Sequence, residues 1–365
     1  MRISIFFFIL LSVALPSGIS SEPSCTNLTT LPMDNGYYIV SESMTLCAGE
    51  YNSTININGS NIVLDCNGST LYKYNTVNGI YIYNDTYSTG FTNITIKNCM
   101  LKSFDKGIYA KSAGPNGTIF LQNITIESSN YGFYINSTTV SNITAYNSTI
   151  STSQSSIYLK DSTLSYFTLE DTSLISSSSY GLYIDNNVNN IRLKNSIIDS
   201  SNDGLYITGA NNVEKIFLQN TTIKSSNNRG LYIQQSTVSN ITAYNSTINT
   251  TQSSISLYNG VTVSDFTLED TSLISSSDLF VYGNIKLYNG VTITNLTIRG
   301  SSLQAGNRGI MWYTMHGSEP KIDNCYLIDS TIDSGGDAIY TSSGIIKNLT
   351  IFNLTISNSQ NGIKL

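Results

Sequence analysis

Charged residues are scarce in this chain: Asp, Glu, Lys and Arg make up 12% of its 365 residues, and there is a single histidine. Because Lys and Glu favour helices, their scarcity argues against long surface helices. The formal net charge is −6, so neither a nucleic acid nor an anionic membrane surface is expected as a partner. With one His and few Met, the ligands of a copper centre are missing, and no cofactor or metal is predicted.

Long apolar runs are also missing, with one exception at the start. The run "ISIFFFILLSVAL" follows Arg2 and precedes the small residues "PSGISS". This order is typical of a secretory signal peptide, and the run is shorter than the roughly 20 apolar residues that cross a bilayer. We therefore predict a signal peptide over 1–21, export to the extracellular space or cell surface, and no transmembrane span after cleavage.

The rest of the chain is rich in Ser, Thr, Asn, Ile and Tyr, and their order repeats. The segment "NGIYIYN" at 78–84 returns as "KGIYAKS", "YGFYINS", "SSIYLKD", "YGLYIDN", "DGLYITG" and "RGLYIQQ", at steps of about 25 residues. A second motif in each repeat has forms such as "ITAYNSTI" and "FTLEDTSL". Both motifs alternate with the period of two that strands have, and the repeat leaves no room for a crossover helix. Each repeat is therefore expected to be one turn of a coil whose successive turns pair in parallel.

These motifs resemble the repeat of right-handed parallel β-helix proteins, the pectate-lyase-like superfold, from about Thr45 onward. The resemblance implies an all-β, single-stranded solenoid of about 12 turns over 61–365, after an N-terminal cap and first turn over 22–60. A four-turn block near 119–180 is duplicated near 216–278, where "IFLQN", "TVSNITAYNSTI" and "FTLEDTSLISSS" all return. The pattern breaks off inside "SQNGIKL", so we expect either further residues or a last turn that pairs with something else.

One polar column interrupts the strand pattern. Aligning the second motif places Asn or Asp at equivalent positions, with Gly300 as an exception: Asn98, Asn123, Asn147, Asp171, Asn195, Asn220, Asn245, Asp270, Asn324 and Asn353. The residue two positions earlier is apolar, so the column is expected to begin on the inward face, at a bend. A ligand site is one interpretation. We favour an inward ladder of stacked amides, as the resembled proteins carry, because it satisfies polar groups buried at the bend.

Four of the five cysteines, Cys25, Cys47, Cys66 and Cys99, cluster in the first repeats. In an exported protein they predict two disulfides, with three possible connectivities. Cys25–Cys47 would pin a cap over the first turn, and Cys66 and Cys99 fall at nearly equivalent positions on adjacent turns. Cys325 aligns with Cys99 and is expected to be a lone, partly buried thiol.

The chain has eighteen Asn-x-Ser/Thr sequons, from Asn27 to Asn353. Export makes some of them candidates for glycosylation. The favoured ones precede an inward Ile or Leu, so that their side chains point to solvent: Asn93, Asn142, Asn240, Asn295 and Asn348. Sequons in the polar column, such as those at Asn147 and Asn245, are expected to stay bare because their amides are committed to the ladder.

Tyrosine takes the outward position after the first inward residue of seven successive repeats: Tyr81, Tyr109, Tyr134, Tyr158, Tyr183, Tyr206 and Tyr232. Since parallel strands lie about 4.8 Å apart, these rings should form a continuous row. Cross-strand stacking that stiffens the sheet is the simpler interpretation, and a platform for a polysaccharide is the other. Longer repeats near the C-terminus suggest a second patch of Arg308, Tyr313, His316 and Asp337.

The resembled superfold includes pectate lyases, polygalacturonases and alginate epimerases as well as non-catalytic surface proteins, so the fold does not decide the activity. This sequence has no Asp-Asp pair, no "NTD", "GHG", "RIK" or "YGxDPH", and four arginines after the predicted signal peptide. It therefore predicts a scaffold that is structural, adhesive or carbohydrate-binding, with a polysaccharide or other surface proteins as partners. A polysaccharide lyase or glycoside hydrolase acting on an acidic polysaccharide is the alternative.

Overall fold

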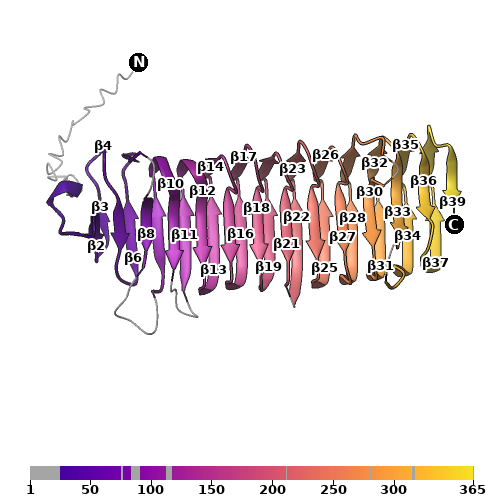
Figure 1. Cartoon of the computed structure of the whole chain (residues 1–365), viewed down its shortest axis with the longest axis horizontal. Helices are drawn as coiled ribbons and strands as arrows, with labels where there is room; N and C mark the ends of the chain where they lie inside the picture. The colour runs from indigo at the N-terminus through magenta and orange to yellow at the C-terminus, as the bar shows by residue number, and fades with distance from the viewer. Residues whose placement is uncertain are drawn as a thin grey trace, which may run out of the picture.

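The computed structural model describes residues 25–74, 77–83, 91–111, 117–210, 212–279, 281–314 and 317–364, so the predicted signal peptide lies outside it. The described residues form a rod of stacked turns, with β2 (Tyr37–Val40) near one end and β39 (Asn361–Lys364) at the other (Figure 1). The strands pair in parallel, except for the antiparallel contact of β1 (Met33–Asp34) with β2. The predicted all-β solenoid of about 12 turns is confirmed. No helix in the described ranges is long and apolar enough to cross a membrane.

Each complete turn supplies strands to three faces of the rod. Face 1 is a sheet of β3 (Met44–Thr45), β6 (Ile62–Asp65), β9 (Ile94–Lys97), β11 (Thr118–Gln122), β13 (Thr139–Tyr146), β16 (Thr163–Glu170), β19 (Val188–Lys194), β22 (Val213–Gln219), β25 (Thr237–Tyr244), β28 (Thr262–Glu269), β31 (Thr292–Arg299), β34 (Lys321–Ile328) and β37 (Ile345–Phe352). Face 2 contains β4 (Glu50–Tyr51), β7 (Thr70–Tyr72), β14 (Thr149–Thr152), β17 (Ser173–Ser176), β20 (Ile197–Ser200), β23 (Thr222–Ser225), β26 (Thr247–Thr250), β29 (Ser272–Ser275), β32 (Ser302–Ala305), β35 (Thr331–Ser334) and β38 (Thr355–Ser357).

Face 3 contains β2, β5 (Ile55–Ile57), β8 (Asn78–Ile82), β15 (Ile157–Lys160), β18 (Leu182–Asp185), β21 (Leu205–Thr208), β24 (Leu231–Gln234), β27 (Ile255–Tyr258), β30 (Gly283–Tyr288), β33 (Arg308–Tyr313), β36 (Asp337–Thr341) and β39. The long strands β10 (Met100–Lys111) and β12 (Thr125–Asn136) bend from face 2 onto face 3 and contribute to both.

One apolar core runs the length of the rod because the inward side chain of each turn lies over its equivalent on the next turn. Ile143 pairs with Phe167, and Phe167 with Ile191, and all three are at most 2% exposed. A single turn has no partner for these side chains, so stacking is what removes them from water.

The glycine of the "YGFYI" motif is required by the close approach of neighbouring turns. A Cβ on Gly132 would lie 2.0 Å from Ile150 Cγ2 and 2.6 Å from the Ser156 carbonyl oxygen. Gly230, its copy in the duplicated block, would meet Ile248 Cγ2 at 2.1 Å. Because these glycines have no Cβ, the backbone at the start of the face 3 strands can lie in close contact with the neighbouring turn.

The predicted amide ladder exists, but its direction and one member were wrong. Its residues have positive φ, for example 53° at Asn123 and 46° at Asn147, and Asn147 Nδ2 donates to Asn123 Oδ1 at 2.8 Å. Both side chains are exposed, since the left-handed residue turns the chain and points its side chain outward. Asn324 is not a member: it pairs with Asn295 and Asn348 in a second column on face 1. Asp329 takes the ladder position and accepts from Asn353 Nδ2 at 3.0 Å.

Buried hydroxyl groups, which the sequence analysis missed, form hydrogen bonds with backbone N–H and carbonyl groups on the inner side of the bend. The residue after each ladder position is turned inward, and in most turns it is Ser or Thr. Ser148 Oγ accepts from the Ile124 N–H at 3.1 Å and donates to the Tyr146 carbonyl at 2.8 Å. Ser196, Ser246 and Ser301 repeat this bridge between turns. The "N-S-T" and "D-T-S" order is the sequence signal: an outward amide or carboxylate followed by an inward hydroxyl.

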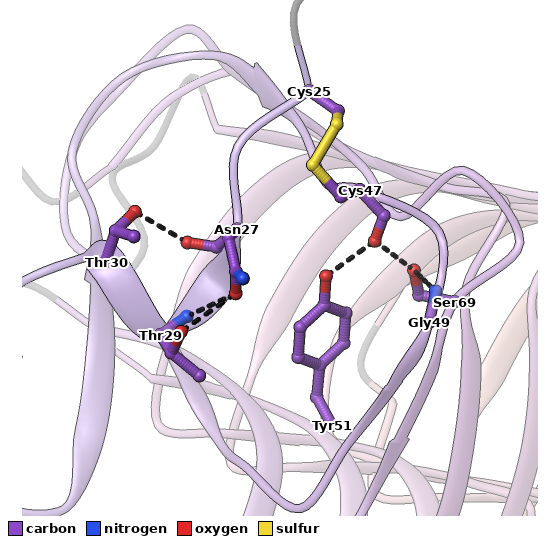
Figure 2. The surroundings of a disulfide bond; sticks show 8 residues. All are labelled: Cys25, Asn27, Thr29, Thr30, Cys47, Gly49, Tyr51 and Ser69. Carbon is purple, nitrogen blue, oxygen red and sulfur yellow. Dashed lines mark hydrogen bonds between the residues drawn. A yellow bond between two sulfur atoms is a disulfide. The ribbon is translucent and has the colours of Figure 1, made fainter.

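The N-terminal end is closed by the two disulfides that the cysteine cluster predicted, Cys25–Cys47 and Cys66–Cys99. Figure 2 shows the first, where Tyr51 Oη and Ser69 Oγ both donate to the Cys47 carbonyl oxygen, at 2.6 and 3.1 Å. Leu28 in the short 3-10 helix η1 (Leu28–Thr30) is fully buried over the core.

The predicted alignment of Cys325 with Cys99 is wrong. Cys325 lies on β34 between Leu296 and Leu349, on the inward side of face 1, whereas Cys99 lies just beyond the ladder corner. The Cys325 thiol is buried and forms no disulfide, and burial raises its pKa to about 12.

Candidate carbohydrate-binding face

The seven predicted tyrosines share one register on face 3 and are called the tyrosine row here. Strand pairing places Tyr81 beside Tyr109, and each member beside the next up to Tyr232. Centroids of consecutive rings lie 4.6–5.3 Å apart. Tyr131 and Tyr180 add rings beside it, each within 5.5 Å of two members.

The aromatic surface continues past Tyr232, which the sequence analysis did not foresee. The next turn has Ser256 in the row's register, but Tyr258 follows two residues later on the same side of the strand. Tyr258 then stacks on Tyr288 with centroids 4.5 Å apart, and Tyr313 meets Tyr288 edge-on at 4.8 Å. Tyr232 connects to Tyr258 at 6.2 Å. The signal was present in "SISLYN", because residues two apart in a strand share a face.

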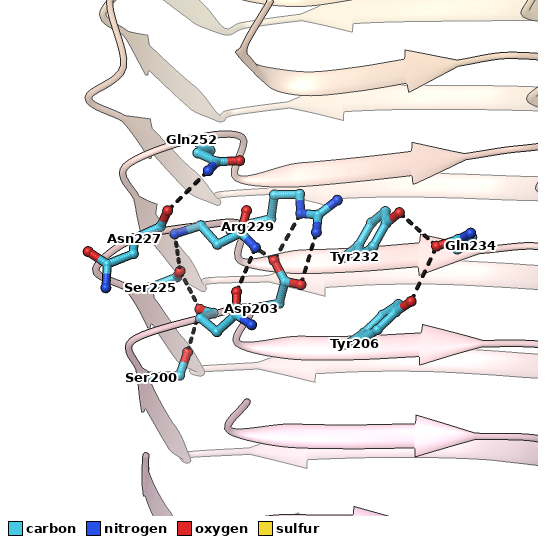
Figure 3. Close-up of polar contacts among 11 residues, drawn as sticks. Ser200, Asp203, Tyr206, Ser225, Asn227, Arg229, Tyr232, Gln234 and Gln252 are labelled. Atoms are coloured by element: carbon cyan, nitrogen blue, oxygen red, sulfur yellow. Dashed lines mark hydrogen bonds and ion pairs between the residues drawn. The ribbon is translucent and has the colours of Figure 1, made fainter. Parts of the chain in front are cut away.

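Neighbouring rings within the row are stacked at Tyr81–Tyr109 and Tyr206–Tyr232, and tilted or edge-on at the other pairs. The rings of Tyr206 and Tyr232 are stacked at 4.8 Å with an angle of 18°, and the Arg229 guanidinium Cζ lies 3.3 Å from the Tyr232 centroid (Figure 3). Both hydroxyls donate to Gln234 Oε1, at 3.2 and 2.8 Å. A ligand at Tyr206 and Tyr232 would therefore meet hydroxyls and ring edges more than open ring faces.

The hydroxyls of Tyr158, Tyr183 and Tyr232 stay protonated at neutral pH, because the pKa of each is raised. Burial is the main cause that raises the pKa of Tyr158 and of Tyr232 to about 12. Burial, with the nearby Asp185 carboxylate, also raises the pKa of Tyr183. A neutral phenol both donates and accepts hydrogen bonds, which suits the hydroxyls of a sugar.

Two arginines on face 3 are each held by an aspartate of an adjacent turn. Asp203 is 1% exposed and receives Arg229 through Nε, at 2.9 Å to Oδ1, and through Nη2, at 3.1 Å to Oδ2 (Figure 3). Arg308 Nε lies 3.7 Å from Asp337 Oδ2, and its Cζ is 3.5 Å from the Tyr340 centroid.

The structure thus brings together Arg308 and Asp337 of the predicted C-terminal patch. It places Tyr313 in the aromatic surface, while His316 lies outside the described residues. Trp312, from the same long repeat, is 1% exposed and fills the core.

Lys286 takes the row's register two turns after Tyr232, between Ser256 and Met311. Its Nζ lies 5.3–5.6 Å from the ring centroids of Tyr282, Tyr288 and Tyr313. Among the described residues, no ion pair includes Lys286. Burial, and then the charge of Arg229, lowers the pKa of its ammonium to about 8.

A pair of carboxylates borders the row at its middle. Asp185 ends β18, and Asp161 follows β15 on the preceding turn with a φ of 48°. Burial first, and then the charge of Asp161, raises the pKa of the Asp185 carboxyl. The carboxylates are also close enough to Tyr158 to raise the pKa of that phenol. Burial and the neighbouring charge thus favour the protonated form of Asp185.

The predicted glycosylation sites lie along face 1. Asn93, Asn142 and Asn348 are exposed, and Asn240 and Asn295 are half-buried. Because the ladder amides are exposed as well, burial does not separate the two sets of sequons, and the preference for the face 1 set stays a prediction.

The family model described as "Right handed beta helix region" matches residues 78–215 and 135–289, which together span more than half of the chain. The protein therefore belongs to the right-handed β-helix family. A search of curated proteins found no match.

Several solved structures share the fold. The A-module of the Azotobacter vinelandii mannuronan C-5 epimerase AlgE6 aligns with a TM-score of 0.53 and 11% identity, over 90% of this chain and 91% of that one. The A-module of AlgE4 from the same organism gives a TM-score of 0.40 and 12% identity, over 88% and 91% of the two chains. The catalytic domain of a GH87 alpha-1,3-glucanase gives 0.34 and 10% identity, over 93% and 70%. At these identities the likeness describes the fold alone.

Proposed function

We propose that this protein is an exported β-helix that binds a polysaccharide along face 3. The observation that carries the proposal is the unbroken aromatic surface from Tyr81 to Tyr313, bordered by the cations Arg229 and Lys286. Turns repeat about every 4.8 Å, a spacing close to the length of one pyranose unit, so a glycan lying along the rod would meet equivalent groups at each sugar. The two disulfides support export to an oxidising compartment.

Replacing Tyr134, Tyr183 and Tyr232 together by Ser tests this proposal. The variant should lose retention on immobilised polysaccharides, measured by affinity electrophoresis against a panel of neutral and acidic glycans, while its β-sheet circular dichroism stays close to that of the parent. The matched control replaces three exposed tyrosines of face 1, Tyr146, Tyr166 and Tyr244, by Ser. Equal retention of both variants, or no retention of the parent by any glycan, would reject the proposal.

A second candidate function is cleavage of the bound polysaccharide, and the carboxylate pair Asp161 and Asp185 favours it. Glycan-cleaving sites need one carboxyl that donates a proton and another that is ionised, and environments that separate their pKa values provide this division. An assay for new reducing ends and for unsaturated products should then show turnover that Asp185→Asn abolishes. Arg308→Ala and Asp337→Ala test the C-terminal patch in the same assay. A parent protein without turnover on any bound glycan is a binding protein.

A further inference from the structure

The cations of face 3 differ in how their charge is balanced. Arg229 faces Asp203 through two hydrogen bonds, and Arg308 faces Asp337. Lys286 has aromatic rings around it and no carboxylate in any ion pair of the described chain. Lys111 and Lys160 on face 3 also appear in no ion pair of the described chain, but Lys286 differs from them in having three rings around its ammonium.

Rings alone balance that charge only in part. The attraction between an ammonium and aromatic rings is weaker than the cost of removing that ammonium from water. The lowered pKa of Lys286 is the expected result, and the cause named first is burial. An anion that approached this ammonium would relieve the imbalance.

The groups that face Lys286 suit an anionic ligand. On its own strand it has Tyr288, from the preceding loop Tyr282, and from β33 Tyr313, all of them phenols that donate hydrogen bonds. The charges of the two neighbouring arginines also reach this cluster. Burial, and then the charge of Arg229, lowers the pKa of Lys286, while burial raises the pKa of Tyr313 and the charge of Arg308 opposes that rise. Asp337 is engaged with Arg308 and with Asn361 Nδ2.

We infer that Lys286, with Tyr282, Tyr288 and Tyr313, forms a subsite for the anionic group of an acidic sugar, either the carboxylate of a uronate or a sulfate ester. This inference rests on the proposed glycan-binding function and adds the substrate class and the residue that recognises its charge. Along the seven-tyrosine row this register holds tyrosines, whereas two turns beyond Tyr232 it holds Lys286.

The first test compares hexagalacturonate, a sulfated hexasaccharide and neutral maltohexaose as probes of the full chain. Lys286→Met should weaken binding of the anionic probe by at least tenfold and leave maltohexaose binding unchanged, while Lys286→Arg should restore the anionic probe. The matched control is Lys215→Met, which removes a lysine that lies 4.8 Å from the Phe217 centroid on face 1. Whichever anionic probe depends on Lys286 identifies the group, uronate or sulfate. Equal weakening of neutral and anionic probes, or no effect on either, would overturn the subsite.

A second measurement separates the failure of the subsite from the failure of the glycan-binding proposal. NMR titration of the Lys286 side chain, assigned with the Lys286→Met variant, is made with and without free galacturonate or inorganic sulfate. An anion bound at the ammonium should raise the pKa of Lys286 by about one unit, because it favours the charged form. If neither anion shifts it, the subsite is rejected even where the tyrosine row binds neutral glycans; if an anion shifts it but no polysaccharide is retained, only the wider proposal fails.

Discussion

The block near 119–180 and its copy near 216–278 bury side chains at the same positions, most of them identical, but differ on face 3. Phe167 and Phe266 are both fully buried, and so are Ile150 and Ile248. On face 3, however, "SSIYLKD" of the first copy has become "SSISLYN", so that Ser256 replaces Tyr158 and Tyr258 replaces Lys160. Packing against two neighbouring turns constrains the inward residues, whereas an outward residue contacts only its neighbours on the face.

The difference also shows that the tyrosine can change its position within the strand while the aromatic surface of face 3 stays continuous. Because residues two apart share a side of the strand, the ring of the second copy stays on face 3 but steps sideways, 6.2 Å from Tyr232. The register that the ring left is taken by Ser256 and, one turn later, by Lys286. The outer face of the first copy thus has Tyr158 and Lys160 where the second has Ser256 and Tyr258, and Lys286 lies one turn beyond the second copy.

The largest expected effect tests whether the two interiors are equivalent. Ile150→Ala and Ile248→Ala each remove a fully buried side chain, and each should lower the free energy of unfolding by about 2–5 kcal/mol, by the same amount within error. Guanidinium unfolding followed by circular dichroism measures both. A cost found in only one copy would mean that the two blocks are not packed alike.

The second prediction concerns Lys286, which takes the row's register one turn after Ser256 of the second copy. Lys286→Met should raise the free energy of unfolding by about 1–3 kcal/mol at pH 7, because the charged form is disfavoured in the folded state. Below about pH 8 Lys286 is protonated in both the folded and the unfolded state, so the full cost of burying its charge destabilises the folded parent. Between about 8 and the ordinary value of 10.5 the folded state has lost the proton while the unfolded state keeps it, so the parent gains stability and the difference shrinks. A difference that does not change with pH would contradict this account, and Lys215→Met should show no gain.

The third prediction uses the phenol that the first copy has and the second lacks at one position. Burial raises the pKa of Tyr158 to about 12, so at alkaline pH the unfolded state releases this proton first and becomes favoured. The stability of the parent should therefore be complete below about pH 10 and fall between pH 10 and 12. Tyr158→Phe should fall less steeply when melting temperatures are compared across this range, and Tyr146→Phe on face 1 is the control. Identical slopes for the parent and Tyr158→Phe would show that this phenol is not desolvated.

The smallest effect concerns the ladder corner that follows the second copy. Gly300 has a φ of 57° and leaves Asp270 without the amide donor that Asp171 receives from Asn195. Gly300→Asn should add this bond and about 0.5–1.5 kcal/mol of stability, since Asn tolerates a left-handed backbone. The new Cβ would lie 2.4 Å from Asp270 Oδ1, so that flexible carboxylate has to turn aside. Gly300→Ala, which supplies no donor, should destabilise, and an equal gain from Ala would contradict the ladder as the cause.

Much of the fold could be predicted because each turn repeats the same local problem. Alternating Ile and Leu, a repeat too short for a helix, and clustered cysteines were enough to predict the solenoid, its core positions and both disulfides. Two of the errors share an origin: Asn324 and Cys325 were assigned to the wrong register near the C-terminus, where the repeats are longer. Lys286 was missed because its neighbours come from a preceding loop and the following turn, which no local pattern connects.

The sequence by itself determined the parallel turns, the residues that face the core and the row of seven tyrosines, because these follow from a period of two and the need to bury apolar side chains. Only the tertiary structure decided where the polar groups of the bend point. Alternation holds while the backbone is extended, and one left-handed residue at the corner reverses it, so the Asn amides face water and the next hydroxyls face the core. Stacking of turns likewise decided that a lysine on an outer face is surrounded by rings with no opposite charge, since that depends on three segments meeting in space.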